Sequence, residues 1–128
     1  MIFDNGEFKT YDEVSHEYVV VPVTTVPVTE LLETWSRLIT ELSLKEIEHY
    51  KCRESYQALS DKIIESTDFK ELYGKNNAEI RKNHVKNELA KEHEHIKNLS
   101  FSIDYLIRKI SFLKQLIHTK TVMMEIKE

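Results

Sequence analysis

The sequence is poor in the residues that form tight turns, with two glycines and two prolines among 128 residues. Because a sandwich or barrel of many short strands needs frequent turns, this scarcity excludes such an all-β fold. Two glycines also leave no glycine-rich loop that would hold a phosphate or a dinucleotide. The single cysteine, Cys52, excludes an internal disulfide and a zinc site built from cysteines. The composition therefore favours a largely helical chain.

Long hydrophobic runs are also missing. No apolar stretch approaches the roughly 20 residues that a membrane-spanning helix needs. Hydrophobic residues nevertheless make up 41% of the chain, and six tyrosines, five phenylalanines and one tryptophan are too many for a disordered tail. We expect one soluble, cytoplasmic domain with no membrane contact.

Charge is unevenly distributed around the net value of −4. Residues 1–34 hold one lysine and seven acidic residues, a local charge of −6. Residues 70–86 hold five basic and two acidic residues, a local charge of +3. Such an acidic head and basic interior segment steer the approach of a partner without identifying it.

Residues 1–28 are predicted to form a small β base. Asn5 and Gly6 lie between two short apolar arms, and both residues adopt positive φ at low cost, which indicates a hairpin turn. The β-branched run at residues 18–21 predicts a strand, and Pro22 predicts that it is an edge strand or ends there. The sequence leaves open whether these strands pair within one chain or between two.

Residues 29–66 are predicted to form a first long helix, which begins at Thr29 as its N-cap. This stretch contains neither glycine nor proline, and apolar residues recur at alternating steps of three and four. The seam consists of Leu31, Trp35, Leu38, Leu42, Cys52, Tyr56, Leu59 and Ile63, with Lys45 and His49 as polar interruptions.

Residues 77–119 are predicted to form a second long helix after a bend at residues 67–76. Its seam is more regular and has nine apolar positions of ten, with Glu92 as the exception. The positions are Val85, Leu89, Glu92, Ile96, Leu99, Ile103, Leu106, Ile110, Leu113 and Ile117. The simplest fold is a mainly α, coiled-coil-like antiparallel hairpin on the β base. The tail at residues 120–128 is β-like, and in this fold it can add a strand to the base.

A second apolar stripe lies beside the leucine and isoleucine seam of the second helix. It comprises Phe101, Tyr105, Arg108 and Phe112. A two-helix hairpin buries one seam only, so this stripe needs another partner. Two alternatives fit: the N-terminal strands cover it, or the chain self-associates through it, with a dimer as the first expectation.

Two Glu-x-x-His pairs, Glu46 with His49 and Glu92 with His95, are candidate metal ligands. Such pairs build di-iron sites in four-helix bundles. In a hairpin that turns near residue 71 they lie at about the same height. The alternative that we favour is a polar His–Glu layer that fixes the register of the helices.

The bend is a candidate contact surface because it combines basic, aromatic and amide side chains. Lysines and arginine there suit phosphate groups, and Tyr73 suits stacking on a base. The candidate residues are Tyr73, Lys75, Asn76, Arg81, Lys82, His84 and Lys86. Docking to a protein is the first interpretation and binding to nucleic acid the alternative, since the net charge of −4 opposes general nucleic-acid affinity.

The same region carries a family resemblance over roughly residues 56–118. It rests on the runs Tyr73-Gly74-Lys75-Asn76-Asn77, Arg81-Lys82-x-His84-Val85 and Ile110-Ser111-Phe112-Leu113-Lys114. In these runs the sequence resembles small coiled-coil accessory proteins encoded by temperate phages of low-GC Gram-positive bacteria. The resemblance implies a phage or mobile-element origin, a place in the host cytoplasm, and binding to a host defence or nucleic-acid-processing protein.

We therefore predict a non-enzymatic protein-interaction module that has no cofactor and forms an oligomer. Cys52 and His49 are three residues apart on one helix, but no oxyanion-hole loop accompanies them. A two-helix rod also offers little volume for the dry pocket that catalysis needs. The alternatives are a nucleic-acid-binding accessory protein that uses the basic bend, and a helical bundle that binds metal through glutamate and histidine.

Overall fold

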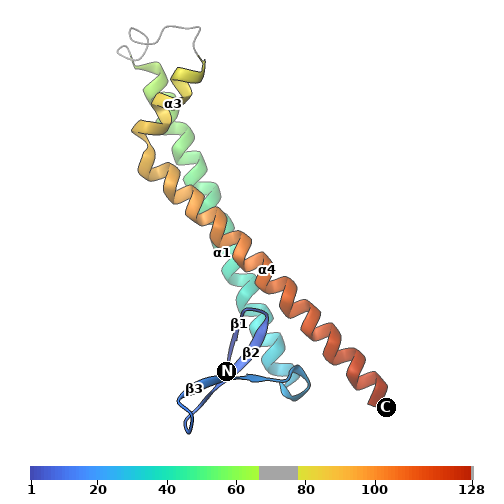
Figure 1. Cartoon of the computed structure of the whole chain (residues 1–128). Helices are drawn as coiled ribbons and strands as arrows, with labels where there is room; N and C mark the ends of the chain where they lie inside the picture. Colours follow the sequence, from blue (N-terminus) through green and yellow to red (C-terminus); the bar gives the residue numbers. More distant parts are fainter. Residues whose placement is uncertain (67–77, 128) are drawn as a thin grey trace. The chain divides into compact units, whose positions relative to one another are not determined.

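The computed structural model describes residues 1–66 and 78–127 (Figure 1). It confirms a mainly helical chain with a small N-terminal β base. Three strands and a short 3₁₀ helix precede the long helices. In chain order the elements are β1 (Ile2–Asp4), β2 (Glu7–Asp12), β3 (Glu17–Val21), η1 (Val23–Thr25), α1 (Val28–Glu65), α3 (Ala78–Glu88) and α4 (Ala90–Lys127).

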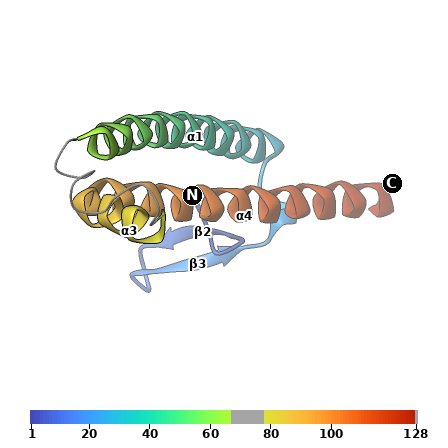
Figure 2. The same cartoon turned by 90° about the horizontal axis from the view of Figure 1, so that it is seen from above.

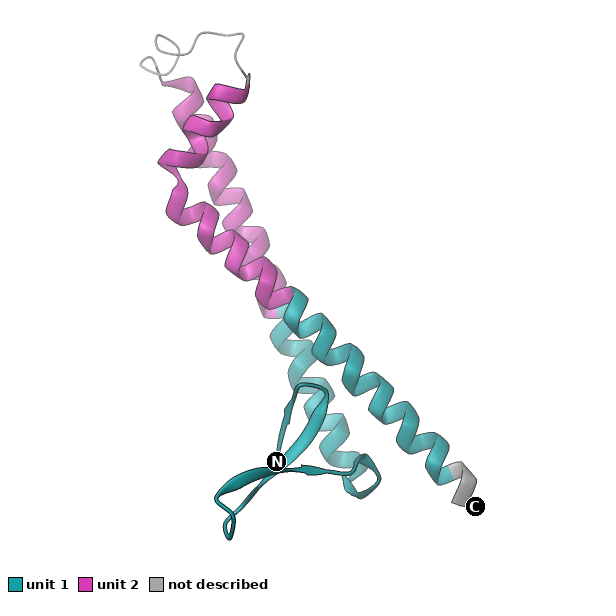
Figure 3. Cartoon of the chain, in the orientation of Figure 1, with its two compact units in different colours: residues 1–43, 104–128 teal, residues 44–103 magenta. Residues whose placement is uncertain are grey.

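The chain divides into two compact units (Figure 3). Unit 1 comprises residues 1–43 and 104–128, and therefore holds the β base with the first part of α1 and the last part of α4. Unit 2 comprises residues 44–103 and holds the rest of α1 and α4 together with α3. Each unit is described by itself below.

The strands of unit 1 form one antiparallel sheet in the order β1-β2-β3, paired within a single chain. The predicted turn joins β1 to β2: Asn5 has φ of 51° and Gly6 has φ of 76°, a pair of positive values that suits a two-residue hairpin. In the second turn the Asp12 carboxylate accepts hydrogen bonds from the Val14 N–H at 3.0 Å and the Ser15 hydroxyl at 3.1 Å. The backbone conformation of two residues therefore sets the first turn, and side-chain hydrogen bonds hold the second.

Pro22 ends the sheet as predicted, because β3 stops at Val21 and η1 follows. The first helix then begins at Val28, and the Pro27 carbonyl accepts the N–H of Leu31 at 3.2 Å. Thr29, the predicted N-cap, therefore lies inside the first turn. The N-cap is instead Pro27, two residues earlier, because its carbonyl is free to accept although its nitrogen has no hydrogen to donate.

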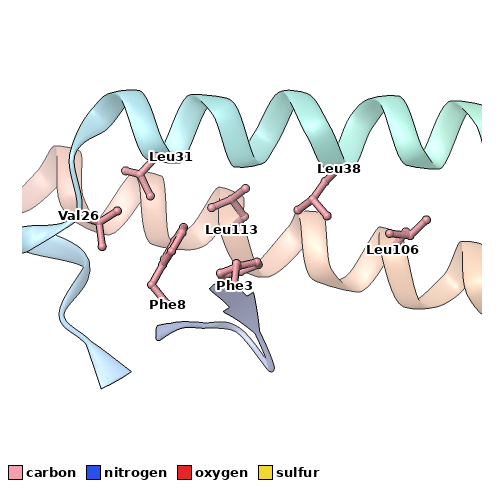
Figure 4. Packing of buried hydrophobic residues seen from close by; sticks show 7 residues of the cluster. All are labelled: Phe3, Phe8, Val26, Leu31, Leu38, Leu106 and Leu113. Atoms are coloured by element: carbon pink, nitrogen blue, oxygen red, sulfur yellow. The ribbon is translucent and has the colours of Figure 1, made fainter. Parts of the chain in front are cut away.

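The core of unit 1 lies between the sheet and the two helices (Figure 4). Its buried members are Phe3, Phe8, Val26, Leu31, Leu38, Leu106 and Leu113. Along α1 the order runs from Leu31 to Leu38, and beside it the order on α4 runs from Leu113 to Leu106, so the helices are antiparallel here. Phe3 and Phe8 pack with ring centroids 4.8 Å apart and form the contribution of the sheet.

Lys120 joins η1 to the last part of α4. Its side chain is buried, and Nζ donates to the Val26 carbonyl and lies 3.5 Å from the carbonyl oxygens of Val23 and Thr24. A 3₁₀ helix leaves carbonyls without partners at its end, and a cation is a favourable partner for them. Lys120 therefore ties the chain segment before α1 to α4.

The seam of the second helical stretch is confirmed along its length. Val85, Leu89, Leu99, Leu106 and Leu113 are buried, and the four isoleucines of the seam are half-buried. Glu92, its polar member, is exposed. In unit 2 the helices are again antiparallel, since His95 of α4 lies beside Glu48 of α1, whereas His93 lies beside Tyr56, which is farther along α1. The period of three and four residues thus identified the packed face correctly.

Two predictions about this stretch need correction. The tail at residues 120–128 was expected to be extended and to add a strand, but α4 continues through it to Lys127. Thr121 and Val122 lower helix propensity by only tenths of a kcal/mol each, and no glycine or proline stops a helix that gains one bond with every residue added. The Thr121 hydroxyl donates to the Ile117 carbonyl at 2.9 Å within the helix.

The second correction concerns Leu89, where the single helix predicted for residues 77–119 divides into α3 and α4. Helical bonding continues across the division: the Leu89 N–H donates to the Val85 carbonyl and the His93 N–H to the Leu89 carbonyl, both at 2.9 Å. The predicted bend at residues 67–76 lies outside the described residues. Among the described helices none is long and apolar enough to cross a membrane.

Candidate protein-interaction surface

The sheet has two different faces because side chains alternate along a strand. Phe8 is 2% exposed and turns toward the core with its partner Phe3. Lys9 and Tyr11, the next residues of opposite orientation in β2, therefore point away from the core. The register places Lys9 opposite Ile2 and Val20, and Tyr11 opposite Tyr18.

The outer face of the sheet is consequently largely apolar, with the half-buried Lys9 between Ile2 and Val20. We use this name for Ile2, Lys9, Tyr11, Tyr18 and Val20. The exposed fractions of its four apolar members are 44%, 49%, 56% and 56%. The two tyrosine rings pack edge to face with centroids 5.4 Å apart, which orients them on this face. Four large apolar side chains from three strands form the kind of patch that marks an interaction site.

β3 is also a free edge. Among the residues that the structure describes, it pairs with β2 alone, in the order β1-β2-β3 (Figure 2). Its residues Glu17–Val20 are exposed. An edge strand directs half of its N–H and C=O groups away from its neighbour, where another strand can bind them. No proline lies within β3, no lysine lies on it, and its register with β2 is continuous over five residue pairs. Of the features that usually block an edge, β3 carries only one charged side chain, Glu17, at its first position.

The opposite edge, β1, is shorter and is covered by a helix. It is three residues long, and its turn lies against α4. The Tyr105 hydroxyl donates to the Asp4 carboxylate at 3.0 Å. A Cβ placed on Gly6 would lie 3.3 Å from Cγ of Phe112. The β1 edge is therefore short and held against a helix, so β3 is the edge open to a partner.

These contacts bear on the second stripe of α4. Tyr105, Arg108 and Phe112 line a pocket of about 190 Å³ with Asn5 and Gly6. The N-terminal strands therefore contact this part of the stripe, as one of the two alternatives expected. Tyr105 and Phe112 keep about half of their surfaces exposed, and self-association through the stripe stays a prediction.

Phe101, the first residue of the stripe, lies in unit 2 and is 60% exposed. The Lys97 ammonium lies 5.9 Å from the centre of its ring. A cation at this distance from an exposed ring contributes a weak attraction.

The contact between Tyr105 and Asp4 changes the acidity of the phenol. The pKa of Tyr105 is raised from its ordinary value, first because the phenol donates its proton to the Asp4 carboxylate in a hydrogen bond. Desolvation and the negative charges of Asp4 and Glu41 act in the same direction. The protonated phenol is thus the form that holds the hairpin turn against α4.

The structure describes only some of the candidate contact residues from the bend. Tyr73, Lys75 and Asn76 lie outside the described residues. Arg81 and His84 are half-buried on α3, while Lys82 and Lys86 are exposed.

Arg81 and Lys82 line a pocket of about 300 Å³ that also includes Tyr56 of α1. Two cations beside one aromatic ring are compatible with a phosphate or a base.

The candidate metal ligands do not form a cluster. Among the residues that the structure describes, no group of three or more His, Cys, Asp or Glu side chains is suited to a metal ion. The cross-helix partner of His95 is Glu48, with Nε2 3.6 Å from Oε1, rather than Glu46 or His49. The predicted height of the two pairs is nevertheless confirmed, because Glu48 lies between Glu46 and His49 in the sequence.

A groove of about 390 Å³ surrounds this His95–Glu48 pair in unit 2. Leu44, Ile47, Lys51, Cys52, Ser55 and Glu92 complete its lining. Leu44 and Ile47 are exposed by more than half. The groove thus combines apolar side chains with charges of both signs, but it presents no unpaired main-chain edge.

The chain matches no protein-family model, no curated protein and no solved structure. Its function therefore has to be argued from its own residues.

Sequence reasoning predicted from Pro22 that β3 is an edge strand or ends there, but it missed the outer face of the sheet. The signal was present in β2, where Phe8 and Thr10 alternate with Lys9 and Tyr11. The register of the strands was needed to interpret this alternation, because the alternation alone does not say which face of the sheet packs on the helices.

Proposed function

We propose that this chain is a non-enzymatic protein-interaction module that binds its partner through the outer face of the sheet and the free edge of β3. The observation that supports this proposal is the position of Tyr18 and Val20, both 56% exposed, on a strand with one unpaired side. Apolar side chains supply contact area, and an unpaired strand supplies oriented main-chain donors and acceptors. Neither property requires a cofactor.

The core of unit 1 supports the same proposal because it holds the sheet in place. Phe3 and Phe8 are nearly fully buried, and the Tyr105–Asp4 hydrogen bond holds the first turn. A rigid scaffold lowers the entropy that is lost on binding. The sequence resemblance implies a location and a partner, and we include both in this proposal. The location is the cytoplasm, and the partner is a host defence or nucleic-acid-processing protein.

The experiment compares two variants that carry the same change in charge. Val20→Glu places a charge on the outer face, whereas Leu32→Glu places one on α1 at a residue that is 57% exposed. Each protein is immobilised and exposed to a lysate, and retained proteins are quantified by mass spectrometry. We expect a defined set of proteins to be retained by the wild type and Leu32→Glu and lost from Val20→Glu. Equal retention by all three would reject the proposal.

A second candidate function is nucleic-acid binding through α3. The position of Arg81 and Lys82 around a pocket shared with Tyr56 favours it. A labelled single-stranded RNA and DNA are titrated with the wild type and with Lys82→Glu, using Lys51→Glu as a control with the same charge reversal. Binding that weakens steeply with salt and is lost only from Lys82→Glu would support this candidate. No binding at low salt would remove it.

A further inference from the structure

Two neighbouring pockets of unit 2 share one side chain. Tyr56 of α1 lines the pocket of about 300 Å³ that contains Arg81 and Lys82, and it also lines a second pocket of about 450 Å³. On α1 the larger pocket is lined from residue 50 to residue 57 and the smaller from residue 56 to residue 64, so the two follow one another along the helix. Both have the size of a site for a small molecule, about 300–1,000 Å³. We call them together the tyrosine groove, whose aromatic and basic residues are Tyr50, Arg53, Tyr56, Arg81, Lys82 and His93.

The rings of the tyrosine groove lie where an unpaired base can reach them. Tyr50 is 62% exposed, and Tyr56 and His93 are half-buried with ring centroids 6.2 Å apart. The hydrogen bond of the Tyr50 phenol to the Glu54 carboxylate raises the pKa of Tyr50 and engages the acidic side chain of the larger pocket. Aromatic side chains of this kind are platforms on which the bases of a single strand stack.

The charge of the tyrosine groove differs from that of the other groove in unit 2. Three basic side chains, Arg53, Arg81 and Lys82, face one acidic side chain, Glu54, which gives a local charge of +2. The groove of about 390 Å³ described above holds two glutamates against Lys51, a local charge of −1 with its histidine neutral. We therefore expect an anionic ligand to select the tyrosine groove.

The order of these side chains suits a chain of nucleotides. Basic side chains hold phosphates, and aromatic rings hold bases. Each of the two pockets contains a cation, and the ring of Tyr56 lies between the pockets. A ligand that reaches both pockets therefore needs more than one phosphate and at least one aromatic group.

We propose that the tyrosine groove binds single-stranded nucleic acid over about two nucleotides, with a base stacked on Tyr56 and phosphates held by the basic side chains of both pockets. This inference rests on the second candidate function, nucleic-acid binding through α3, and extends that site along α1 to Arg53. It also assigns a preference for single strands, since the bases of a duplex are already stacked on one another. The site lies within unit 2 and does not use the outer face of the sheet.

The direct test measures binding of a labelled short oligouridylate to the full chain by fluorescence anisotropy. An RNA duplex, uridine monophosphate and polyglutamate are the competitors. We expect the single strand to bind at least about tenfold more tightly than each competitor. The logarithm of its binding constant should fall with that of the salt concentration with a slope of about −2, since three cations meet phosphates. Equal binding by the duplex or polyglutamate would show charge attraction without stacking, and equal binding by the monophosphate would show a site for one nucleotide. Each of these results would overturn the inference.

Stacking on Tyr56 is tested by removal of its ring. Tyr56→Leu keeps an apolar side chain, whereas Tyr56→Phe keeps the ring. Phe101→Leu is the control, because Phe101 is 60% exposed beside the Lys97 ammonium in unit 2 and is not part of the described lining of either pocket. We expect Tyr56→Leu to weaken binding by about fivefold or more and the other two variants to bind within about twofold of the wild type. Equal binding by Tyr56→Leu, or an equal loss from Phe101→Leu, would overturn the stacking role.

The extent of the site along α1 is tested by charge reversal in the two grooves of unit 2. Arg53→Glu changes the tyrosine groove, and Lys51→Glu changes the other groove. Both residues are exposed, so these variants are expected to fold even where Tyr56→Leu does not, which circular dichroism checks. We expect Arg53→Glu alone to weaken binding by about fivefold or more and to make the salt dependence shallower. An equal loss from both variants would show a general charge effect and overturn the inference.

Failure of this inference can be separated from failure of the functions proposed above. If Lys82→Glu loses the single strand while Tyr56→Leu and Arg53→Glu retain it, α3 binds nucleic acid without the tyrosine groove, and only the inference falls. If no oligonucleotide binds at low salt, the inference and the second candidate function fall together. Protein binding through the outer face is decided separately, by the proteins that Val20→Glu loses in unit 1.

Discussion

The two units use the same pair of helices but bury different amounts of apolar surface. Unit 1 has a core cluster of seven buried side chains from β1, β2, α1, α4 and Val26, which follows η1. Among its described residues, unit 2 buries Val85, Leu89 and Leu99 as its hydrophobic members. Two helices in contact enclose one seam, whereas a sheet on the same pair adds a third layer and closes the space between them.

The two units are therefore expected to have different roles. The layered unit holds a surface in fixed geometry, while the two-helix unit leaves apolar residues such as Leu44, Ile47 and Tyr50 more than half exposed. Burial of apolar surface is the main favourable term in folding, so unit 1 is expected to provide most of the stability. Each prediction below changes one part of this comparison.

The largest effect is expected from the same substitution made in each unit. Leu113 is fully buried in unit 1 and Leu89 is 7% exposed in unit 2. We expect Leu113→Ala to lower the free energy of unfolding by about 4 kcal/mol and Leu89→Ala by about 2 kcal/mol, because the cost rises with the cavity that cannot close. Urea denaturation followed by circular dichroism measures both, and an equal or larger loss for Leu89→Ala would contradict the comparison.

A smaller effect is expected when η1 is released from α4. Lys120→Met keeps most of the buried aliphatic chain but leaves the carbonyls of Val23, Thr24 and Val26 without this donor. We expect a loss of about 1–3 kcal/mol in the free energy of unfolding. Lys114→Met, at an exposed position of the same helix, is the control and should change stability by less than about 0.5 kcal/mol. A similar loss from both variants would remove the structural role assigned to Lys120.

The first hairpin turn provides the next test. Gly6→Ala is expected to cost about 1–2 kcal/mol, since residue 6 has φ of 76° and a Cβ there would lie 3.3 Å from the Phe112 ring. Asn5→Gly, at the other positive-φ position of the turn, is expected to leave stability within about 0.5 kcal/mol. Thermal unfolding measures both variants. An unchanged melting temperature for Gly6→Ala would show that the turn moves freely away from α4.

The smallest effect concerns pH and the contact between β1 and α4. The pKa of Tyr105 is raised from its ordinary value of 10.0 by the hydrogen bond to Asp4, so the folded state holds this proton more firmly than the unfolded state does. The resulting stabilisation is present below the ordinary pKa and is lost as pH rises through the raised value. We expect Tyr105→Phe to lower the melting temperature slightly at about pH 8, with the difference from the wild type shrinking as the phenol of the wild type loses its proton in alkaline solution.

Asp4→Asn is the companion variant for this test. Without the carboxylate, ultraviolet titration should show the pKa of Tyr105 closer to its ordinary value. A difference between Tyr105→Phe and the wild type that grows as pH rises would have the wrong sign for this contact.

Much of the fold could be predicted because its signals are local. Asn5 and Gly6 specified a hairpin turn, Pro22 ended a strand, and the seam from Val85 to Ile117 identified the packed face of two helices. Each of these signals depends on the backbone preferences of a few residues or on a short period. The sequence also predicted that the two Glu-x-x-His pairs lie at about the same height along the helices. In an antiparallel hairpin, the numbers of two facing residues have a nearly constant sum.

The errors and omissions arose where distant segments decide the outcome. Thr121 and Val122 suggested a strand, but they continue a helix whose preceding residue, Lys120, is anchored to η1. Glu46 and His49 suggested metal ligands, but the side chain that meets His95 is Glu48. Over several turns, helical periodicity predicts which residues face each other only to within about one residue. A shift of one residue is enough to change which polar side chains meet.

The amino-acid sequence by itself determined the kinds of elements, their approximate ends and the helix faces that pack, because these follow from backbone preference and hydrophobic period. Only the tertiary structure decided which face of the sheet turns toward the helices and which strand keeps a free edge. The physical reason is that a strand offers two faces and two edges of similar chemistry. Contacts of Phe3, Phe8 and Tyr105 with residues far along the chain select among them.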